Sequence, residues 1–190
     1  FLFQMQAINN IETLNSYSVK SIVTTCPHCF NTIKNEYPEL GGRYTVYHHS
    51  QFLNKMLMDG RISVKGGNFK GKKITFHDPC YLGRANGVYE APRNLIKKID
   101  AELIELKRSR SKGLCCGAGG AQMFKESEQG QKEISSERAE EIAESEAEIV
   151  AAACPFCNTM ISDALKTDKN EKDNTKIYDI AELIANANEL

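Results

Sequence analysis

Five of the seven cysteines in this chain come from three separate stretches of sequence, and their spacing limits how the chain can fold. Cys80 stands alone, Cys115 and Cys116 are adjacent, and Cys154 and Cys157 are separated by two residues. The pattern is C-x34-C-C-G-x36-C-x-x-C. The two sulfurs of a C-x-x-C turn lie close enough together to bind one metal ion or one cluster. If all five thiols share a site, the fold has to bring three distant segments together.

The adjacent pair restricts the chemistry of such a site. Neighbouring Cα atoms are about 3.8 Å apart, which is below the usual disulfide range of about 4.4–6.8 Å. Cys115 and Cys116 therefore suit different atoms of a multinuclear centre better than they suit a bond to each other. Thiolates favour iron–sulfur clusters, zinc and copper(I), and five ligands exceed what tetrahedral zinc or an ordinary cubane cluster uses. The pattern predicts an iron–sulfur centre of unusual ligation.

The chain also contains an internal repeat. Residues 22–29 (IVTTCPHC) match residues 150–157 (VAAACPFC), and residues 44–54 parallel residues 175–185. Each copy predicts a short strand ending in C-P-x-C, a helix, a second short strand and another helix. The second copy is preceded by about 75 further residues, which carry Cys80 and the adjacent pair. We expect an equivalent segment before Phe1, so the first copy is predicted to be incomplete.

The coarse pattern is an alternation of strands and helices. Strands are predicted at Ser21–Thr25, Thr45–Tyr47, Lys73–His77, Leu103–Leu106, Glu148–Ala152 and Lys176–Tyr178, because these runs are short, β-branched and bounded by turn residues. Helices are predicted at Leu2–Asn15, Cys29–Tyr37, Ser50–Asp59, Ala91–Ile99, Gln131–Ser145, Cys157–Leu165 and Ile180–Asn188. This alternation favours an α/β fold of two related Rossmann-like lobes, with short parallel sheets flanked by helices and an incomplete first lobe.

The predicted division of the chain follows from the repeat. Residues 1–65 form the trailing half of the first copy, residues 66–72 a glycine-rich linker, and residues 73–190 the complete domain. In parallel sheets, ligands gather beyond the carboxyl ends of the strands. Cys26, Cys80 and Cys154 are all predicted to lie there.

The residues around the cysteines resemble the cysteine-rich CCG domain of heterodisulfide-reductase-type proteins. The likeness is carried by residues 77–84 (HDPCYLGR), 115–120 (CCGAGG) and 153–157 (ACPFC), and it covers about residues 73–165. It is nearest to heterodisulfide reductase D-like proteins and flavoprotein-associated iron–sulfur oxidoreductases.

The resemblance implies a non-cubane [4Fe-4S] cluster held by Cys80, Cys115, Cys116, Cys154 and Cys157. It further implies a subunit of an oxidoreductase that transfers electrons, with disulfide reduction as the family's most specific chemistry. Such proteins usually carry a ferredoxin-like segment, and no C-x2-C-x2-C run is found in this sequence. The implied partner is therefore a ferredoxin-like or flavoprotein redox subunit.

Zinc remains the alternative at both cysteine groups. Four of the five thiols could hold zinc in a non-redox interaction domain. Cys26 and Cys29 could form a Cys2His2 site with two of His28, His48 and His49. The interpretation that we favour for these two cysteines is an incomplete first site.

Two further patterns bear on the site. His77 is predicted to end a strand as a hydrogen-bonding core residue, and a proton-handling role beside the cluster is the alternative. The acidic stretch 133–148 is typical of the exposed face of an amphipathic helix, with Ile134, Ala139, Ile142 and Ile149 facing inward.

Composition excludes several classes of function. A net charge of −1 gives no reason to expect a nucleic-acid partner, and no apolar run approaches the roughly 18 residues of a membrane span. An odd number of cysteines without a secretion signal predicts reduced thiols in the cytoplasm. The incomplete first lobe predicts an open sheet edge, through which the chain could associate with itself.

Overall fold

The computed structural model describes residues 1–65, 67–126, 129–167 and 175–189. The strands are β1 (Ser21–Thr24), β2 (Thr45–His48), β3 (Lys73–Phe76), β4 (Glu102–Ile104), β5 (Ile149–Ala152) and β6 (Lys176–Asp179). The α-helices are α1 (Leu2–Ser16), α2 (Pro27–Asn31), α3 (His49–Met58), α4 (Glu90–Lys98), α5 (Ile134–Glu144), α6 (Pro155–Thr167) and α7 (Ile180–Ala187). Within these ranges, no helix has the length and apolar character that crossing a bilayer requires.

The strands form two sheets, and every strand pair is parallel. The larger sheet has the order β4-β3-β5-β6, and the smaller one pairs β1 with β2. The registers of the two repeats match, because Thr24 lies opposite His48 just as Ala152 lies opposite Asp179. The predicted α/β fold with short parallel sheets is confirmed.

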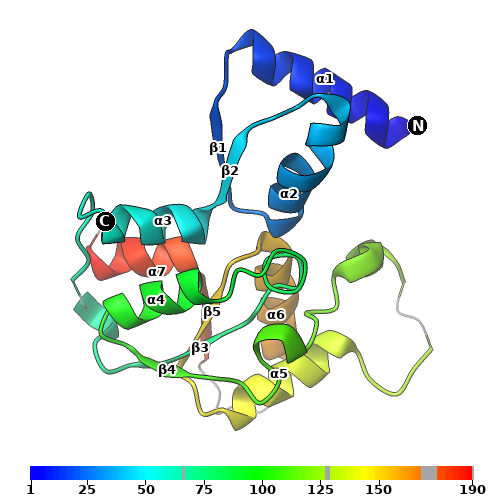
Figure 1. Ribbon diagram of the computed structural model, residues 1–190. Coiled ribbons are helices and arrows are strands. Elements are labelled where there is room, and N and C mark those ends of the chain that lie inside the picture. The colour runs from blue at the N-terminus through cyan, green and yellow to red at the C-terminus, as the bar shows by residue number, and fades with distance from the viewer. Residues whose placement is uncertain (66, 127–128, 168–174, 190) are drawn as a thin grey trace.

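Helices cover both faces of the larger sheet (Figure 1). On one face α4 and α7 pack against Ile74, Phe76, Ile149 and Ala151. On the other face α5 and α6 enclose Val150, the alternate residue of β5. A parallel strand buried on both sides is apolar throughout rather than alternating, and all four residues of β5 are buried.

The first repeat contributes to this core. Helix α3 lies beside α4 and α7 (Figure 1), and Phe30 is part of the same apolar cluster as Phe76. The two repeats also meet through a side-chain bond, in which His49 Nε2 lies 2.8 Å from Asp179 Oδ1. Asp179 in addition caps α7 by accepting a hydrogen bond from the backbone N–H of Ala181. Asp179, at the end of β6, thereby contacts the first turn of α3 through His49 and the first turn of α7 through Ala181.

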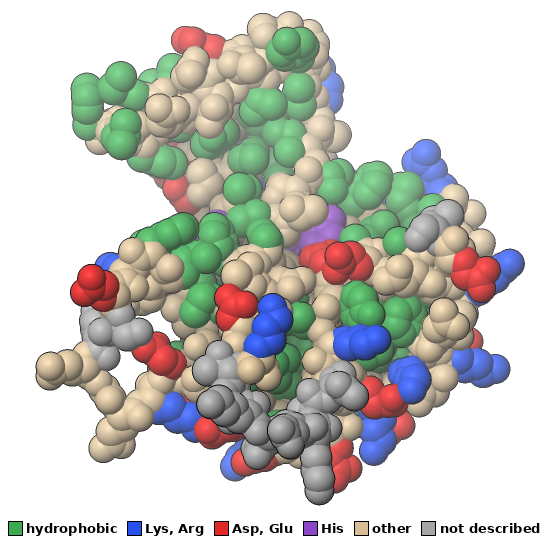
Figure 2. Space-filling model, turned by 180° about the vertical axis from the view of Figure 1, so that it is seen from behind, with side chains coloured by type: hydrophobic (Ala, Val, Ile, Leu, Met, Phe, Trp, Pro, Cys, Tyr) green, Lys and Arg blue, Asp and Glu red, His purple; other side chains and the backbone are tan. Residues whose placement is uncertain are grey.

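The part of the molecule built from α1, α2, β1 and β2 stands apart from the larger sheet (Figure 1). Its small core contains Ala7, Ile11 and Tyr37. Apolar side chains are visible on the surface of this part at the top of Figure 2. The exposed large apolar residues of this part are Phe1, Leu2, Phe3, Met5, Ile8, Tyr17 and Val23. Among the described residues β1 pairs only with β2, so one edge of β1 is open. Association through this surface stays a prediction.

Several predicted boundaries differ from the structure. Helix α5 begins at Ile134 instead of Gln131, and the prediction that Ile134 faces inward is wrong because its side chain is 44% exposed. Ile142 of the same helix is fully buried, as predicted. Strand β4 ends at Ile104, two residues before the predicted end. Within the predicted linker, Phe69 is buried in the main core.

The two isoleucines of α5 provide a matched test of this packing. Ile142→Ala removes a buried side chain and leaves a cavity, so we expect a loss of about 2–5 kcal/mol in the free energy of unfolding. Ile134→Ala removes an exposed side chain, and the change should stay within about 0.5 kcal/mol. Urea denaturation of both variants measures the two values. Equal losses would contradict the burial of α5 described here.

The cap of α3 makes a prediction about pH. His48 caps α3 through its ring, which accepts a hydrogen bond from the backbone N–H of Ser50 and lies 2.8 Å from the Ser50 hydroxyl. Burial, with a smaller effect of His49, lowers the pKa of His48 from 6.5 to about 3. An unfolded chain therefore takes up a proton below pH 6.5 that the folded protein does not bind. The stability contributed by neutral His48 is complete above pH 6.5 and is lost as the pH falls toward 3.

His48→Asn tests this dependence, because asparagine is a good helix cap that does not titrate. Below pH 6.5 the variant should lose less stability than the wild type, by up to about 1.4 kcal/mol per pH unit. Urea denaturation between pH 7 and pH 4.5 measures the difference. Parallel losses in both proteins would show that His48 does not titrate as described.

Candidate metal centre

The five predicted cysteine ligands line one pocket. Strands β3 and β5 are neighbours in the parallel sheet, so the loops that follow them leave the same edge. One of these loops carries Cys80, and the other leads through Cys154 into α6. The pocket is lined by Cys80, Cys115, Cys116, Cys154 and Cys157 together with Pro27, His28, Pro79, Tyr81, Ala118, Gly119 and Phe156. The three cysteine-bearing segments are therefore brought together in the folded chain.

Hydrogen bonds between neighbouring thiol groups shift the pKa values of the cysteines in the pocket. Hydrogen bonds from Cys116 and Cys80 hold the pKa of Cys115 well below its usual range. Hydrogen bonding with Cys157 likewise lowers the pKa of Cys154 to about 7. The neighbours shift in the opposite direction, and Cys115 raises the pKa of Cys116 to about 11. Thiolate is the form that binds metal, and Cys115 and Cys154 are the thiols of the pocket whose pKa is lowered.

The loop after the adjacent pair brings backbone close to the sulfurs. The backbone N–H of Gly117 donates to Cys115 Sγ at 3.3 Å. Gly117 has φ +92°, and a Cβ atom there would lie 3.3 Å from the backbone nitrogen of Ser135. A side chain at this position would meet both an unfavourable backbone conformation and a close contact. The glycine is therefore required for the N–H group to reach the site.

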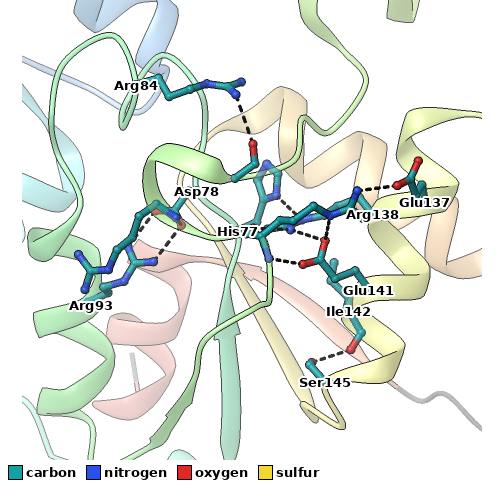
Figure 3. Close-up of polar contacts among 12 residues, drawn as sticks. His77, Asp78, Arg84, Arg93, Glu137, Arg138, Glu141, Ile142 and Ser145 are labelled. Atoms are coloured by element: carbon teal, nitrogen blue, oxygen red, sulfur yellow. Dashed lines mark hydrogen bonds and ion pairs between the residues drawn. The ribbon is translucent and has the colours of Figure 1, made fainter.

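A buried ion pair anchors two of the three segments. Nη1 and Nη2 of Arg93 donate to the two carboxylate oxygens of Asp78, each at 2.8 Å (Figure 3). Nε of Arg93 donates to Glu105 at 2.6 Å. Asp78 in turn accepts a hydrogen bond from the backbone N–H of Arg110 at 2.6 Å. Arg84 Nη1 also donates to the backbone oxygen of Gly113, at 3.3 Å. These contacts join the Cys80 loop to the segment that leads into Cys115.

A second buried arginine, Arg138, contacts His77, which is a neighbour of the cysteine sulfurs. Arg138 Nε donates to His77 Nδ1 at 3.1 Å, and its Nη1 donates to Glu141 at 3.0 Å (Figure 3). Burial, followed by the charge of Arg138, lowers the pKa of His77 to about 3. A ring nitrogen of His77 and the sulfurs of Cys116 and Cys157 all lie within 4.8 Å of one another. His77 is therefore a neutral, buried neighbour of the cysteine pocket, in agreement with its predicted place in the core.

Cys26 and Cys29 do not line this pocket. Cys26 is half-buried with its sulfur 3.8 Å from His28 Nδ1, and Cys29 is exposed. The His28 ring instead packs on Tyr81, with ring centroids 4.4 Å apart, and its edge approaches Phe156. The C-P-x-C turn of the first repeat thus supplies a wall of the pocket while its own two sulfurs stay outside.

The histidines do not assemble a zinc site at Cys26 and Cys29. His48 is engaged with Ser50, and His49 with Asp179. In the part of the chain that the structure describes, no group of three potential ligand atoms within 4.8 Å of one another includes Cys26 or Cys29. The geometry gives no support to the predicted alternative of zinc at this position.

Sequence reasoning missed the two buried arginines. Arg93 lies in the stretch that carries the family resemblance, and Arg138 is the single basic residue between Glu133 and Glu148. A lone arginine on the same helix face as Ala139 and Ile142 was a usable indication of burial, because that face is apolar. Its partner could not be identified in this way, since His77 lies 61 residues away in the sequence.

The sequence matches the family model described as a cysteine-rich domain, CCG, over residues 2–34 and 74–162. It is 40% identical over its whole length to the EtfAB:quinone oxidoreductase of Syntrophomonas wolfei, and covers 27% of that protein. It is 42% identical over 97% of the chain to the "Probable iron-sulfur-binding oxidoreductase FadF" of Bacillus subtilis, and covers 26% of it. It is 34% identical over 95% of the chain to a subunit of the dihydromethanophenazine:CoB--CoM heterodisulfide reductase of Methanosarcina barkeri, and covers 44% of that subunit.

The chain thus spans less than half of the length of these relatives. The matched residues of the family model include all seven cysteines and both copies of the C-P-x-C turn. The predicted resemblance is confirmed, and the chain belongs to the CCG cysteine-rich domain family.

Proposed function

We propose that this chain binds an iron–sulfur cluster and serves as an electron-transferring part of an oxidoreductase. The ligands would be Cys80, Cys115, Cys116, Cys154 and Cys157, and the cluster a non-cubane [4Fe-4S] centre. The observation that carries the proposal is the convergence of these five sulfurs on one pocket. When bound, such a cluster supplies one-electron redox chemistry.

The donor set fits a cluster better than it fits a single zinc ion. Tetrahedral zinc uses four ligands, which would leave one buried or half-buried thiol without a role. The adjacent sulfurs of Cys115 and Cys116 suit two different metal atoms. The surroundings also suit an anionic centre, because the N–H group of Gly117 and the start of α6 present hydrogen-bond donors to sulfur.

The pocket has to widen to hold a cluster. The free space between the lining atoms is about 10 Å³, because the thiol groups lie against one another. Cys80 and Cys154 follow strands of a rigid sheet, so they have little freedom to move. The segment 113–120 contains four glycines and no long regular element, and its last two residues are exposed. We therefore assign the adjustment to this segment, which carries Cys115 and Cys116.

Electron exchange requires an approach to the protein surface. Cys80 and Cys115 are half-buried, and Tyr81 beside them is 41% exposed. This side of the pocket is the natural place for a redox partner to dock. The names of the relatives, a quinone oxidoreductase and part of a heterodisulfide reductase, support a partner that is another redox subunit. We propose a flavoprotein or ferredoxin-like subunit, and a cytoplasmic setting in which the thiols stay reduced.

Individual cysteines should differ in importance. We expect Cys116→Ser and Cys154→Ser to abolish cluster binding, since each removes a sulfur that lines the pocket. Cys26→Ser should leave most of the iron in place, because Cys26 lies outside the pocket. Iron and sulfide analysis of anaerobically purified variants measures this difference. Equal iron loss in all three variants would mean that both repeats contribute ligands to one cluster.

Colour and metal content separate the cluster from zinc. The anaerobically purified protein should be brown, with broad absorbance near ~400 nm and bound iron and sulfide. Chelation of the iron or exposure to air should bleach this absorbance. A colourless protein that contains about one zinc per chain and no iron would show instead that the pocket is a zinc site of an interaction domain.

A further inference from the structure

The proton of the His77 ring is placed by its arginine neighbour. His77 is 1% exposed and Arg138 is fully buried, so water does not compete for their contact. Arg138 Nε donates to His77 Nδ1 at 3.1 Å (Figure 3). A guanidinium group has only donors, so His77 Nδ1 has to act as an acceptor. A neutral imidazole with an acceptor at Nδ1 carries its proton on Nε2.

Arg138 cannot easily rotate out of this arrangement. Its Nη1 donates both to Glu141 at 3.0 Å and to the backbone oxygen of Arg108 at 3.0 Å. Glu141 is itself held by the backbone N–H and the side chain of Arg108, at 2.6 and 3.0 Å. The guanidinium group is thus held by Glu141 of helix α5 and by the loop that contains Arg108.

Stability alone does not account for this arginine. Arg138 Nη2 is buried and has no hydrogen-bond partner among the described residues. A buried N–H group without a partner is costly, and apolar replacements of buried ion pairs are often neutral or stabilising. A buried arginine with this cost is a candidate for a role in the site that it touches.

The nitrogen of His77 that remains available is Nε2. It lies on the side of the ring away from Arg138 (Figure 3). One ring nitrogen of His77 lies within 4.8 Å of the sulfurs of Cys116 and Cys157. Coordination of a metal through Nε2 would move the proton to Nδ1, where it would face the Nε–H of Arg138. Two donors would then oppose each other in a buried site. His77 is therefore suited to donate to sulfur and unsuited to coordinate iron or zinc.

We propose that Arg138 holds His77 in the tautomer whose Nε2–H donates a hydrogen bond to a cysteine sulfur of the cluster, and that this bond raises the cluster's reduction potential. The inference rests on the cluster proposed above. A donor directed at a ligand sulfur stabilises the more negative, reduced state more than the oxidised state. His77 and Arg138 are positioning residues in this arrangement, because neither binds a metal atom.

The first test is the midpoint potential of the anaerobically purified holoprotein. His77→Phe keeps a buried aromatic ring and removes the N–H group. At a fixed potential the ratio of reduced to oxidised cluster should fall about tenfold, a shift of about 59 mV to more negative potential for a one-electron couple. His77→Gln should restore part of the potential, because its amide can accept from Arg138 and donate to sulfur.

His48→Asn is the matched control, since His48 is equally buried but lies outside the pocket. Its potential should equal that of the wild type. An unchanged potential in a cluster-loaded His77→Phe protein would overturn the inference while leaving the proposed cluster intact. If the wild type itself binds no cluster, the proposed function fails and this inference fails with it.

A double-mutant cycle tests whether Arg138 acts through His77. Arg138→Met removes a positive charge, which lowers the potential by itself. If Arg138 also sets the tautomer, the shift should be larger in the His77 protein than in the His77→Phe protein. Equal shifts in both backgrounds would show that Arg138 acts by its charge alone and would overturn its assigned role.

Spectroscopy of the wild-type holoprotein gives an answer even if a variant fails to load its cluster. In the paramagnetic state, pulsed electron–nuclear double resonance with ¹⁵N-labelled histidine should detect a weakly coupled ring nitrogen. It should also detect a proton that exchanges in D₂O. His28→Phe removes the other histidine at the pocket, so strong coupling typical of a directly bound nitrogen that persists in this variant would identify His77 as a ligand. The absence of both signals would show that the hydrogen bond is not formed. Either result would overturn the inference.

Discussion

The parallel pairing of β3 with β5 is the interaction on which the cysteine pocket depends. In register, Phe76 lies opposite Ala151, so both strands end at the same edge and their loops start side by side. Helices on both faces bury all of β5 and the last three residues of β3, which makes the edge a rigid base. A site assembled from distant segments needs such a base, because sulfur–metal distances tolerate little variation. The third segment is the irregular, glycine-rich loop that carries Cys115 and Cys116, and it brings both residues to the same pocket.

Two buried arginines connect this base to the loops. Arg93 joins Asp78, directly after β3, to the stretch that precedes Cys115, and Arg138 joins His77 to α5. Buried ion pairs add little net stability, because desolvation opposes the attraction between the charges. Their contribution here is geometric. The bidentate bonds of Arg93 fix the orientation of Asp78, and Arg138 is held by Glu141 and the backbone oxygen of Arg108 while it donates to His77. The polar residues between β3 and Cys80 thereby acquire defined positions beside an otherwise apolar core.

The two repeats use the same turn in different ways. In the second repeat the C-P-x-C turn places Cys154 and Cys157 in the pocket, and in the first repeat Pro27 and His28 form part of the pocket wall. The caps also differ: His48 and Asp179 occupy equivalent strand ends, and each begins a helix. Asp179 is paired with His49 of the other repeat. Similar local sequence therefore specifies the turn, while its surroundings decide what the turn contributes.

The sequence by itself determined the α/β class, the six parallel strands, the repeat and the five cysteines that meet, because strand period, turn residues and ligand spacing are local properties. The start of α5 and the exposure of Ile134 were wrong in the prediction, since an apolar residue near a helix end can face solvent at little cost. Tertiary structure alone decided that Arg138 meets His77, that Arg93 meets Asp78, and that His28 lines the pocket of the five cysteines. These contacts join residues from different elements, and a buried charge reveals its partner only when the chain has folded around it.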